Sequence, residues 1–283
     1  MLTGLQKDQD ALSACMAPLW VGMLDPNVPE EKRMIERSLD NVSRFEKDHG
    51  LAATAEDYGH PEMQWNGPSG WAPLHMMTIE SEVRYGRYDA AARQTQKWLD
   101  TMDRMYDKDG MIIERYDVVN GGHPPVQKGR YEETQGAGPG FGWTNATVPW
   151  ALIEVIGGVR LHRDAEAPTR MDIIPHLPEG LQTAPTKLKF VNPGSNHEWT
   201  LSHHYQEDKS RYDFSIDGDF TSIPDLKLVT PPLPRGMAPK KSDHCPAYRI
   251  KEQPAENGLV RYELDFHGLT GKQKFDLSWG AQA

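Results

Sequence analysis

Apolar residues in the first half of the chain recur every three or four positions, which is the spacing of one face of an α-helix. The longest such run alternates these two steps over six positions: Tyr88, Ala91, Thr95, Trp98, Met102 and Met105. It stops at Asp109-Gly110, where a glycine can close the last turn. We therefore predict one long helix that ends at residue 109 and buries this stripe.

Shorter apolar repeats, each with its own start and stop signals, predict three further helices. One begins at Pro29 and runs towards Gly50, because proline favours the first turn of a helix and glycine ends one. A second follows Trp71-Ala72-Pro73 and ends near Gly86. A third spans residues 144–157. The first half of the chain is thus predicted to be helical.

The second half changes to a period of two, which is typical of strands with one buried face. Four segments alternate in this way: residues 199–205, 212–216, 260–266 and 275–279. Turn signals such as Asn257-Gly258 separate them. This pattern predicts an antiparallel β-sandwich.

The two periods together predict an α+β chain of more than one domain. We expect a helical portion over residues 1–165, a proline-rich linker over 166–184 and the β-sandwich over 185–283. Within the β-sandwich, the proline- and lysine-rich residues 230–246 are predicted to be an irregular excursion.

Composition and charge exclude some classes of function. The 283 residues carry a formal net charge of −10, which argues against a nucleic-acid partner because such partners need a basic face. The chain has no long apolar run, so no membrane-spanning segment is predicted. Lys7, Asp8 and Asp10 precede any apolar stretch, so no signal peptide is visible and the compartment stays open. Two cysteines set no disulfide framework.

Three stretches gather aromatic, glycine and polar residues in a way that suits sugars: residues 63–74, 112–117 and 140–145. Sugar C–H faces pack against aromatic rings, while hydroxyl groups take hydrogen bonds from polar side chains. Trp65, Trp71 and Trp143 are therefore candidates for a sugar platform, with core packing as the alternative.

Glu114 follows the apolar residues 111–113, so its carboxylate could be partly desolvated and activate a water as a general base. The alternative is an exposed glutamate paired with Arg115. Asp117 could orient a neighbour or cap a turn. His203 and His204 are adjacent on a predicted strand and point to opposite faces, which disfavours a metal pair. No metal site and no cofactor is predicted.

The three stretches together resemble trehalases, over roughly residues 10–157. Residues 64–73 read Gln-Trp-Asn-Gly-Pro-Ser-Gly-Trp-Ala-Pro and are similar to the family signature, with Asn66 in place of Asp. Glu114-Arg115-Tyr116-Asp117 resembles the family's Glu-Lys-Tyr-Asp. Residues 140–145 match the family's Gly-Phe-Gly-Trp-Thr-Asn without change.

The resemblance implies part of an (α/α)6 barrel, about half a toroid, whose loops form a sugar pocket. It gives Glu114 the role of general base in an inverting hydrolysis of an α-linked disaccharide or α-glucoside. It also implies a carbohydrate-binding set, in which Arg130 stands where the family has a sugar-contacting Glu, with Glu132 or Glu133 as substitutes after a local shift. The members of this set are Gln64, Trp65, Asn66, Trp71, Tyr116, Asp117, Arg130, Phe141 and Trp143.

Two features of the resemblance predict that residues outside this chain complete the active site and the barrel. The family's general acid is an Asp in an upstream motif that this chain lacks, although inversion requires both an acid and a base. The barrel also needs roughly twelve helices, whereas residues 1–165 hold about six at ~12 residues per helix plus loops. We therefore expect an N-terminal barrel half, or a second copy of the chain, to complete the fold.

Two other functions compete with the hydrolase. The chain could be a non-catalytic sugar-binding or interaction protein derived from a glycosidase barrel. Alternatively, the β-sandwich could itself bind carbohydrate through Trp199, Tyr205, Tyr212 and Trp279, although their alternation favours core packing.

Overall fold

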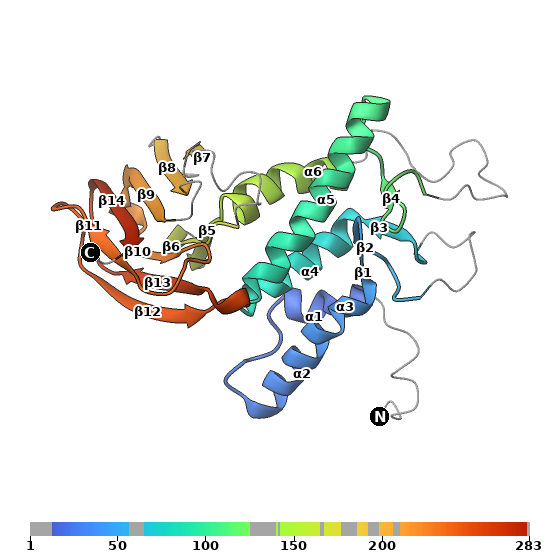
Figure 1. Cartoon of the computed structure of the whole chain (residues 1–283), viewed down its shortest axis with the longest axis horizontal. Coiled ribbons are helices and arrows are strands. Elements are labelled where there is room, and N and C mark those ends of the chain that lie inside the picture. The colour runs from blue at the N-terminus through green and yellow to red at the C-terminus, as the bar shows by residue number, and fades with distance from the viewer. Residues whose placement is uncertain are drawn as a thin grey trace. The chain divides into compact units, whose positions relative to one another are not determined.

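The computed structural model describes residues 13–56, 65–124, 140, 142–164, 167–176, 186–191, 198–205 and 210–281 (Figure 1). The chain divides into two compact units, Met1–Ala151 and Leu152–Ala283. The first unit is mainly helical and the second is built of strands. The change of hydrophobic period along the sequence therefore marks a real change of structure.

The helices of the first unit are α1 (Ala17–Trp20), α2 (Pro29–Asp40), α3 (Val42–Phe45), α4 (Ala72–Arg84), α5 (Tyr88–Asp109) and α6 (Gly142–Trp150). The predicted stripe on α5 is confirmed, because Ala91, Trp98 and Met102 are buried. Gly110 ends this helix in the left-handed conformation, with φ of 68°. The helix predicted from Pro29 is shorter than expected, since it breaks at Asn41 and its second piece ends at Phe45.

Two short antiparallel ribbons complete the first unit, and the sequence did not predict them. Strands β1 (Glu46–Lys47) and β2 (Gly50–Leu51) form one, and β3 (Ser69–Trp71) and β4 (Arg115–Asp117) form the other. The last predicted helix is confirmed as α6, followed by a π-helical segment over Ala151–Ile156. Pro149 lacks the N–H that a regular α-helix would use there.

The second unit contains two five-stranded sheets. The first has the order β12-β13-β10-β6-β5 and the second has the order β11-β14-β9-β8-β7. The strands are β5 (Val159–Asp164), β6 (Ala167–Ile173), β7 (Thr186–Val191), β8 (Glu198–Tyr205), β9 (Arg211–Asp219), β10 (Asp225–Val229), β11 (Met237–Lys241), β12 (Tyr248–Pro254), β13 (Val260–Phe266) and β14 (Lys272–Ala281). The four strands expected from the alternation, now β8, β9, β13 and β14, are confirmed.

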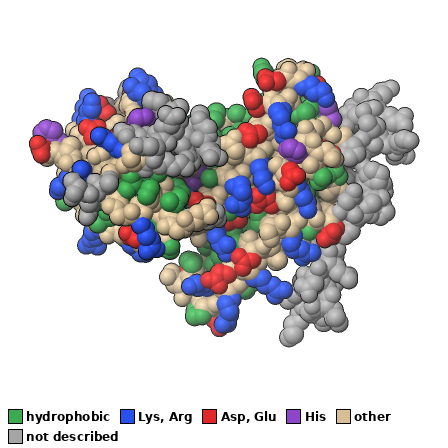
Figure 2. Space-filling model, in the orientation of Figure 1, with side chains coloured by type: hydrophobic (Ala, Val, Ile, Leu, Met, Phe, Trp, Pro, Cys, Tyr) green, Lys and Arg blue, Asp and Glu red, His purple; other side chains and the backbone are tan. Residues whose placement is uncertain are grey.

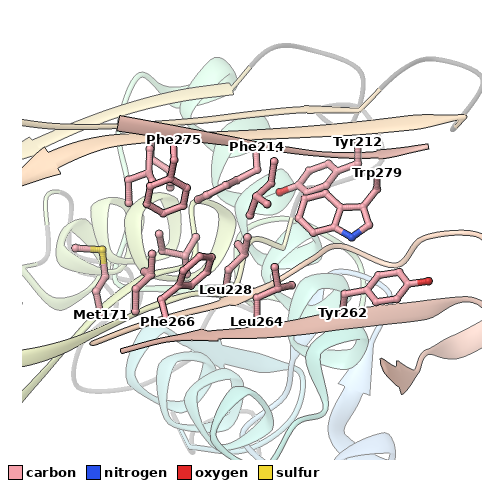
Figure 3. Close-up of a cluster of buried hydrophobic side chains, with 14 of the residues drawn as sticks. Met171, Tyr212, Phe214, Leu228, Tyr262, Leu264, Phe266, Phe275 and Trp279 are labelled. Carbon is pink, nitrogen blue, oxygen red and sulfur yellow. The ribbon is translucent and has the colours of Figure 1, made fainter. Parts of the chain in front are cut away.

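The two sheets share one hydrophobic core, so the unit is a β-sandwich. Phe214, Phe275 and Trp279 from one sheet face Leu264 and Phe266 from the other (Figure 3). The core also buries Trp199, Tyr205 and Tyr212. These rings are therefore packing residues, as their alternation indicated, and they form no exposed sugar platform.

Three details of the β-sandwich differ from the prediction. β6 and β10 pair in parallel, so the sheets are not wholly antiparallel. β5 and β6 lie before and within the predicted linker; they are short and mix charged residues with Pro168, which hid their alternation. Within the expected irregular excursion over residues 230–246, Met237–Lys241 form an edge strand, β11, a position that tolerates Pro239 and Lys240. The predicted division into a helical portion (1–165), a linker (166–184) and a β-sandwich domain (185–283) stays a prediction.

The surface of the first unit mixes charges of both signs. On the face shown in Figure 2, basic and acidic side chains are interspersed. Ion pairs of this unit include Arg87–Asp40 and Arg33–Glu30. In the described ranges, no helix combines the length and apolarity needed to cross a bilayer. The same ranges hold no group of three or more His, Cys, Asp or Glu side chains placed to bind a metal ion.

Candidate active site

The β3–β4 ribbon joins two of the three sugar-like stretches. Ser69 lies opposite Asp117, Gly70 opposite Tyr116 and Trp71 opposite Arg115. Gly70 is required at its position, because a Cβ there would come within 2.2 Å of Cγ1 of Val118. The ribbon therefore brings residues 69–71 directly beside the residue that follows Glu114.

The third stretch is tied by two hydrogen bonds to the segment that leads into β4. The hydroxyl group of Thr144 donates to the carbonyl oxygen of Glu114 at 3.1 Å. The N–H of Gly140 donates to the carbonyl oxygen of Ile112 at 2.8 Å. The backbone on both sides of Glu114 is thus held by the segment that begins α6.

Three tryptophans from these stretches form an aromatic cluster. The rings of Trp65 and Trp71 are stacked, with centroids 4.2 Å apart and planes 5° apart. Trp143 meets both rings edge-on, at 5.7 Å from Trp71 and 6.5 Å from Trp65. Trp71 is 1% exposed, whereas Trp65 is 49% and Trp143 is 37% exposed. Trp71 is therefore the packed centre of the cluster, and the other two rings offer aromatic surface to a ligand.

Glu114 is half-buried and immediately precedes β4. The neighbouring Arg115 is buried, and its guanidinium lies 6.0 Å from the centre of the Trp71 ring and donates to the hydroxyl of Ser69 at 2.6 Å. Burial lowers the pKa of Arg115, and the negative charge of Glu114 partly offsets this effect. Arg115 thus links the candidate base to the aromatic cluster.

His75 on α4 holds the β3–β4 ribbon through its hydrogen bond to β3. Its Nδ1–H donates to the carbonyl oxygen of Trp71 at 2.9 Å, and its Nε2 accepts from the N–H of Leu51 at 2.7 Å. Burial lowers the pKa of His75 to about 3, so the ring is neutral near pH 7 and these two bonds define its tautomer. Its ring also stacks on Trp98 at 3.9 Å.

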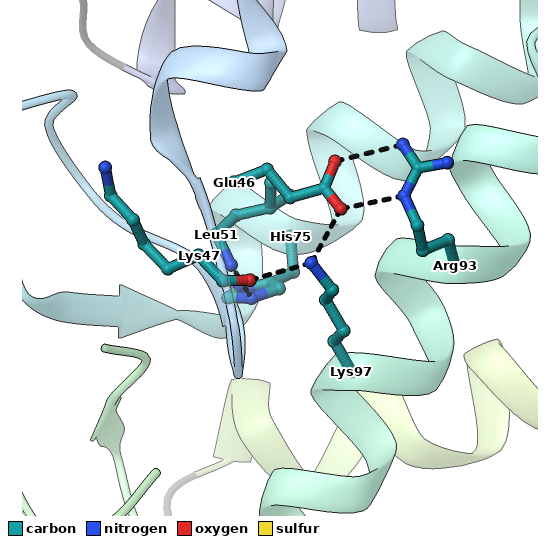
Figure 4. A network of polar contacts seen from close by, with 6 residues as sticks. All are labelled: Glu46, Lys47, Leu51, His75, Arg93 and Lys97. Atoms are coloured by element: carbon teal, nitrogen blue, oxygen red, sulfur yellow. Dashed lines mark hydrogen bonds and ion pairs between the residues drawn. The ribbon is translucent and has the colours of Figure 1, made fainter. Parts of the chain in front are cut away.

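A carboxylate on β1 connects this anchor to α5 (Figure 4). Glu46 accepts from Arg93 at 2.9 and 3.1 Å and from Lys97 at 2.8 Å. β1 is paired with β2, whose Leu51 donates to His75. A continuous set of polar contacts therefore runs from α5 through the β1–β2 ribbon to the backbone of Trp71.

Tyr116 and Asp117 support the backbone around Glu114. Tyr116 is fully buried; its hydroxyl oxygen accepts from the N–H of Ile113 at 3.0 Å, and burial raises its pKa to about 12. Asp117 caps the following turn by accepting from the backbone N–H groups of Val119 and Asn120, both at 2.9 Å. In this structure, both side chains hold the loop rather than line an open surface, so a sugar contact by either stays a prediction.

Asn66 lies at the position where the family signature has Asp. It is 4% exposed, and its Oδ1 accepts from the hydroxyl of Thr54 at 3.2 Å. The same hydroxyl oxygen accepts from the N–H of Gly67 at 2.8 Å. A hollow of about 390 Å³ lies beside this turn, lined in part by Thr54, Pro68 and Asn120. The predicted site residues Gln64, Arg130 and Phe141 lie outside the described residues.

Sequence reasoning missed His75, Arg115 and Thr144 as parts of this arrangement. A lone histidine within a helix pattern carries no signal of its role, because its two partners lie in other elements. Thr144 was visible only as a member of the matched stretch 140–145. Arg115 was considered only as a surface partner of Glu114, whereas it is buried against Trp71.

The sequence that carries this arrangement is similar to known proteins. Residues 3–156 match the family model described as Trehalase. The chain is 34% identical over 142 residues to the cytosolic neutral trehalase of Kluyveromyces lactis, covering 46% of this chain and 18% of that protein. It is 29% identical over 188 residues to the periplasmic trehalase of Salmonella schwarzengrund, covering 64% of this chain and 28% of that protein.

Among solved structures, an α-L-rhamnosidase from Dictyoglumus thermophilum shares the fold, with a TM-score of 0.51 and 11% identity over 95% of this chain and 25% of that one. The chain thus has a mixed fold of helices and sheets that also occurs in this α-L-rhamnosidase. The family match spans more than half of the chain, and the chain belongs to the trehalase family. It spans between 18% and 28% of the length of the trehalases named above.

Proposed function

We propose that this chain carries the general base and the aromatic wall of a trehalase-type glycoside hydrolase that inverts the anomeric centre. Glu114 is the proposed base. The single observation that best supports this proposal is the meeting of the three family stretches around Glu114: Arg115 pairs with Trp71, and Thr144 holds the Glu114 backbone.

In the proposed reaction, the carboxylate of Glu114 takes a proton from a water molecule as that water attacks the anomeric carbon. A general acid on the other side protonates the glycosidic oxygen, and the bond between this oxygen and the anomeric carbon breaks. Because the water enters opposite the leaving group, the configuration inverts, and the two carboxyl groups must be about 6.5–9.5 Å apart. The half-buried position of Glu114 and its rigid backbone suit such a base.

The proposed substrate is trehalose or another α-linked disaccharide or α-glucoside. Trp65 and Trp143 offer exposed ring surface against which the C–H face of a pyranose can pack. We assign the remaining sugar contacts to Gln64, Asn66, Trp71, Tyr116, Asp117, Arg130 and Phe141, following the family resemblance. Among these, Trp71, Tyr116, Asp117 and Asn66 act chiefly by fixing the pocket wall, since each is buried.

The proposal includes an (α/α)6 barrel that further helices complete. These helices supply the general acid, and they come from an N-terminal barrel half or from a second copy of the chain. Exposed apolar side chains around α1 and α2, namely Trp20, Val21, Met23 and Met34, fit a surface on which such helices pack. A stable monomer that hydrolyses trehalose unaided would refute this part of the proposal.

The deciding assay measures glucose released from a panel of α-linked disaccharides. The chain is tested alone at high concentration, then together with any protein encoded immediately upstream. In whichever preparation is active, Glu114→Gln should lower kcat at least a hundredfold, as expected when a general base is removed. Proton NMR of the first products should show one glucose released as the β-anomer. Full activity of the variant would remove Glu114 from this role.

The specific observation that favours a second candidate, a sugar-binding protein without turnover, is Asn66. Its amide replaces the carboxylate of the family signature and is buried against Thr54. Calorimetry with trehalose separates the two functions, because heat of binding without product in the complete assembly would support the second.

A further inference from the structure

A polar hollow lies on the outer face of the β11-β14-β9-β8 sheet, within the second unit. Its volume is about 510 Å³, which is within the roughly 300–1,000 Å³ typical of small-molecule sites. Its lining includes the polar residues His204, Asp213, Ser215, Lys240, Asp276 and Ser278. It is built without any residue of the proposed hydrolytic site.

The strand register explains why this face is hollowed. Lys240, Ser278, Asp213 and His204 lie opposite one another across four strands. In the next row, Ser215 lies between Asp276 and Ser202. Short serine side chains from β14, β9 and β8 thus stand among longer side chains and leave room above the sheet. The alternate residues, such as Phe214 and Leu277, point into the core.

The lining has the hydrogen-bonding groups that a hydroxyl-rich ligand needs. Lysine and arginine donate, aspartates accept, and the serine hydroxyl groups do both. The lining carries carboxylates from Asp213 and Asp276 beside its cationic groups, and Arg211 is already bonded to Asp213 at 2.8 Å. A strongly anionic ligand would meet these carboxylates, whereas a neutral sugar can use both kinds of group. Among the described residues of the lining, the one ring besides the histidines is Phe214, which is buried, so binding would rest on hydrogen bonds rather than on stacking.

We propose that this hollow, called here the sheet hollow, binds a neutral carbohydrate chain. The binding would hold the protein at an oligo- or polysaccharide independently of hydrolysis. Because the sheet hollow shares no residue with the aromatic cluster, the loss of one need not affect the other. The proposal therefore survives even if Glu114 proves to have no catalytic role.

The test uses the full 283-residue chain in native gels that contain a neutral soluble polysaccharide. The probes are an α-glucan, a mixed-linkage β-glucan, a xyloglucan and a glucomannan, with heparin as an anionic probe. We expect at least one neutral probe to retard the chain. Ser215→Gln fills the centre of the sheet hollow with a polar side chain, and should weaken that retardation about tenfold or more.

The matched control is Asp217→Gln, which faces the same side of β9 two residues further on and lies outside the lining. It should leave retardation unchanged, and so should Trp65→Ala in the aromatic cluster. Ser278→Gln repeats the test on β14 should Ser215→Gln fail to fold, which circular dichroism would reveal. The proposal is overturned if no neutral probe retards the chain, if only heparin does, or if Trp65→Ala abolishes retardation while the serine variants retain it.

Discussion

Trp71 and Arg115 lie directly opposite each other in the β3–β4 ribbon, with the guanidinium 6.0 Å from the centre of the indole ring. Both side chains are about 1% exposed. A desolvated cation over an aromatic face contributes about 2 kcal/mol. The pair therefore fixes the residue next to the proposed base against the centre of the aromatic cluster.

Replacing Arg115 by Ala should lower the free energy of unfolding by about 3 kcal/mol. The change removes the contact with the Trp71 ring and the hydrogen bond to Ser69, and it leaves a cavity. Urea unfolding followed by tryptophan fluorescence measures the effect. The control is Arg33→Ala on α2, where the side chain is 71% exposed, and the change should stay within about 0.5 kcal/mol. Equal losses in the two variants would contradict the packed role of Arg115.

Gly70→Ala should destabilise the β3–β4 ribbon, because the added Cβ would meet Cγ1 of Val118 at 2.2 Å. The expected cost is about 2 kcal/mol, typical of overpacking at a site that cannot relax freely. Val118→Ala removes the obstructing atom, so the double variant should lose less than the two single variants together. Gly122→Ala is the control, since nothing lies within 4 Å of its added Cβ. Strict additivity in the double-mutant cycle would contradict the contact.

Trp143→Ala should weaken sugar binding about tenfold while lowering the free energy of unfolding by only about 1 kcal/mol. The ring is 37% exposed, so little of its burial stabilises the fold, whereas its free surface is proposed to pack on the sugar. Tyr106→Ala is the control, because this ring is 55% exposed on α5 and lies outside both the aromatic cluster and the proposed packing surface. Calorimetry with trehalose should show a loss of affinity for Trp143→Ala alone. An equal loss of affinity in both variants would contradict the proposed contact between the Trp143 ring and the sugar.

Helices and strands were predictable where the hydrophobic pattern runs without interruption through a whole element. The stripe of α5 is continuous over its length, and strands such as β9 and β14 alternate without interruption. β5 and β6 escaped detection because charged residues and Pro168 break their alternation. The parallel pairing of β6 with β10 joins segments far apart in the chain, and no local pattern encodes it.

The sequence predicted which segments belong to the candidate site, but it did not predict how these segments are arranged in space. The family resemblance marked Glu114, Trp71 and Trp143, yet each strand of the ribbon that joins the first two has only three residues. Strands this short carry no periodic signal. The role of His75 depends on Leu51 and Trp71, which reach it from two other elements. Such contacts arise from tertiary packing, which single-sequence patterns do not describe.

Glu46 should make the first unit sensitive to acid. Burial opposes its ionisation, but the hydrogen bonds and charges of Arg93 and Lys97 more than offset this and lower its pKa from 4.5 to about 2. A carboxylate with a lowered folded-state pKa stabilises the fold above pH 4.5, and this contribution disappears as the pH falls towards 2. Arg93 is 46% exposed, so solvent screens its charge. We therefore expect ionised Glu46 to contribute on the order of 2 kcal/mol to the free energy of unfolding at pH 7.

The measurement is the free energy of unfolding of the wild type and of Glu46→Gln between pH 7 and pH 2. At pH 7 the variant should be less stable by the amount above, and the two curves should converge as the pH falls below 4.5. Asp40→Asn is the control: its carboxylate pairs with Arg87 but is 67% exposed, so the change in the free energy of unfolding should be small. Hydrogen exchange should locate the effect of Glu46→Gln in β1, β2 and the facing part of α5, since these are the elements that the carboxylate joins. Parallel curves for Glu46→Gln and the wild type would show that Arg93 and Lys97 do not depress the pKa of Glu46.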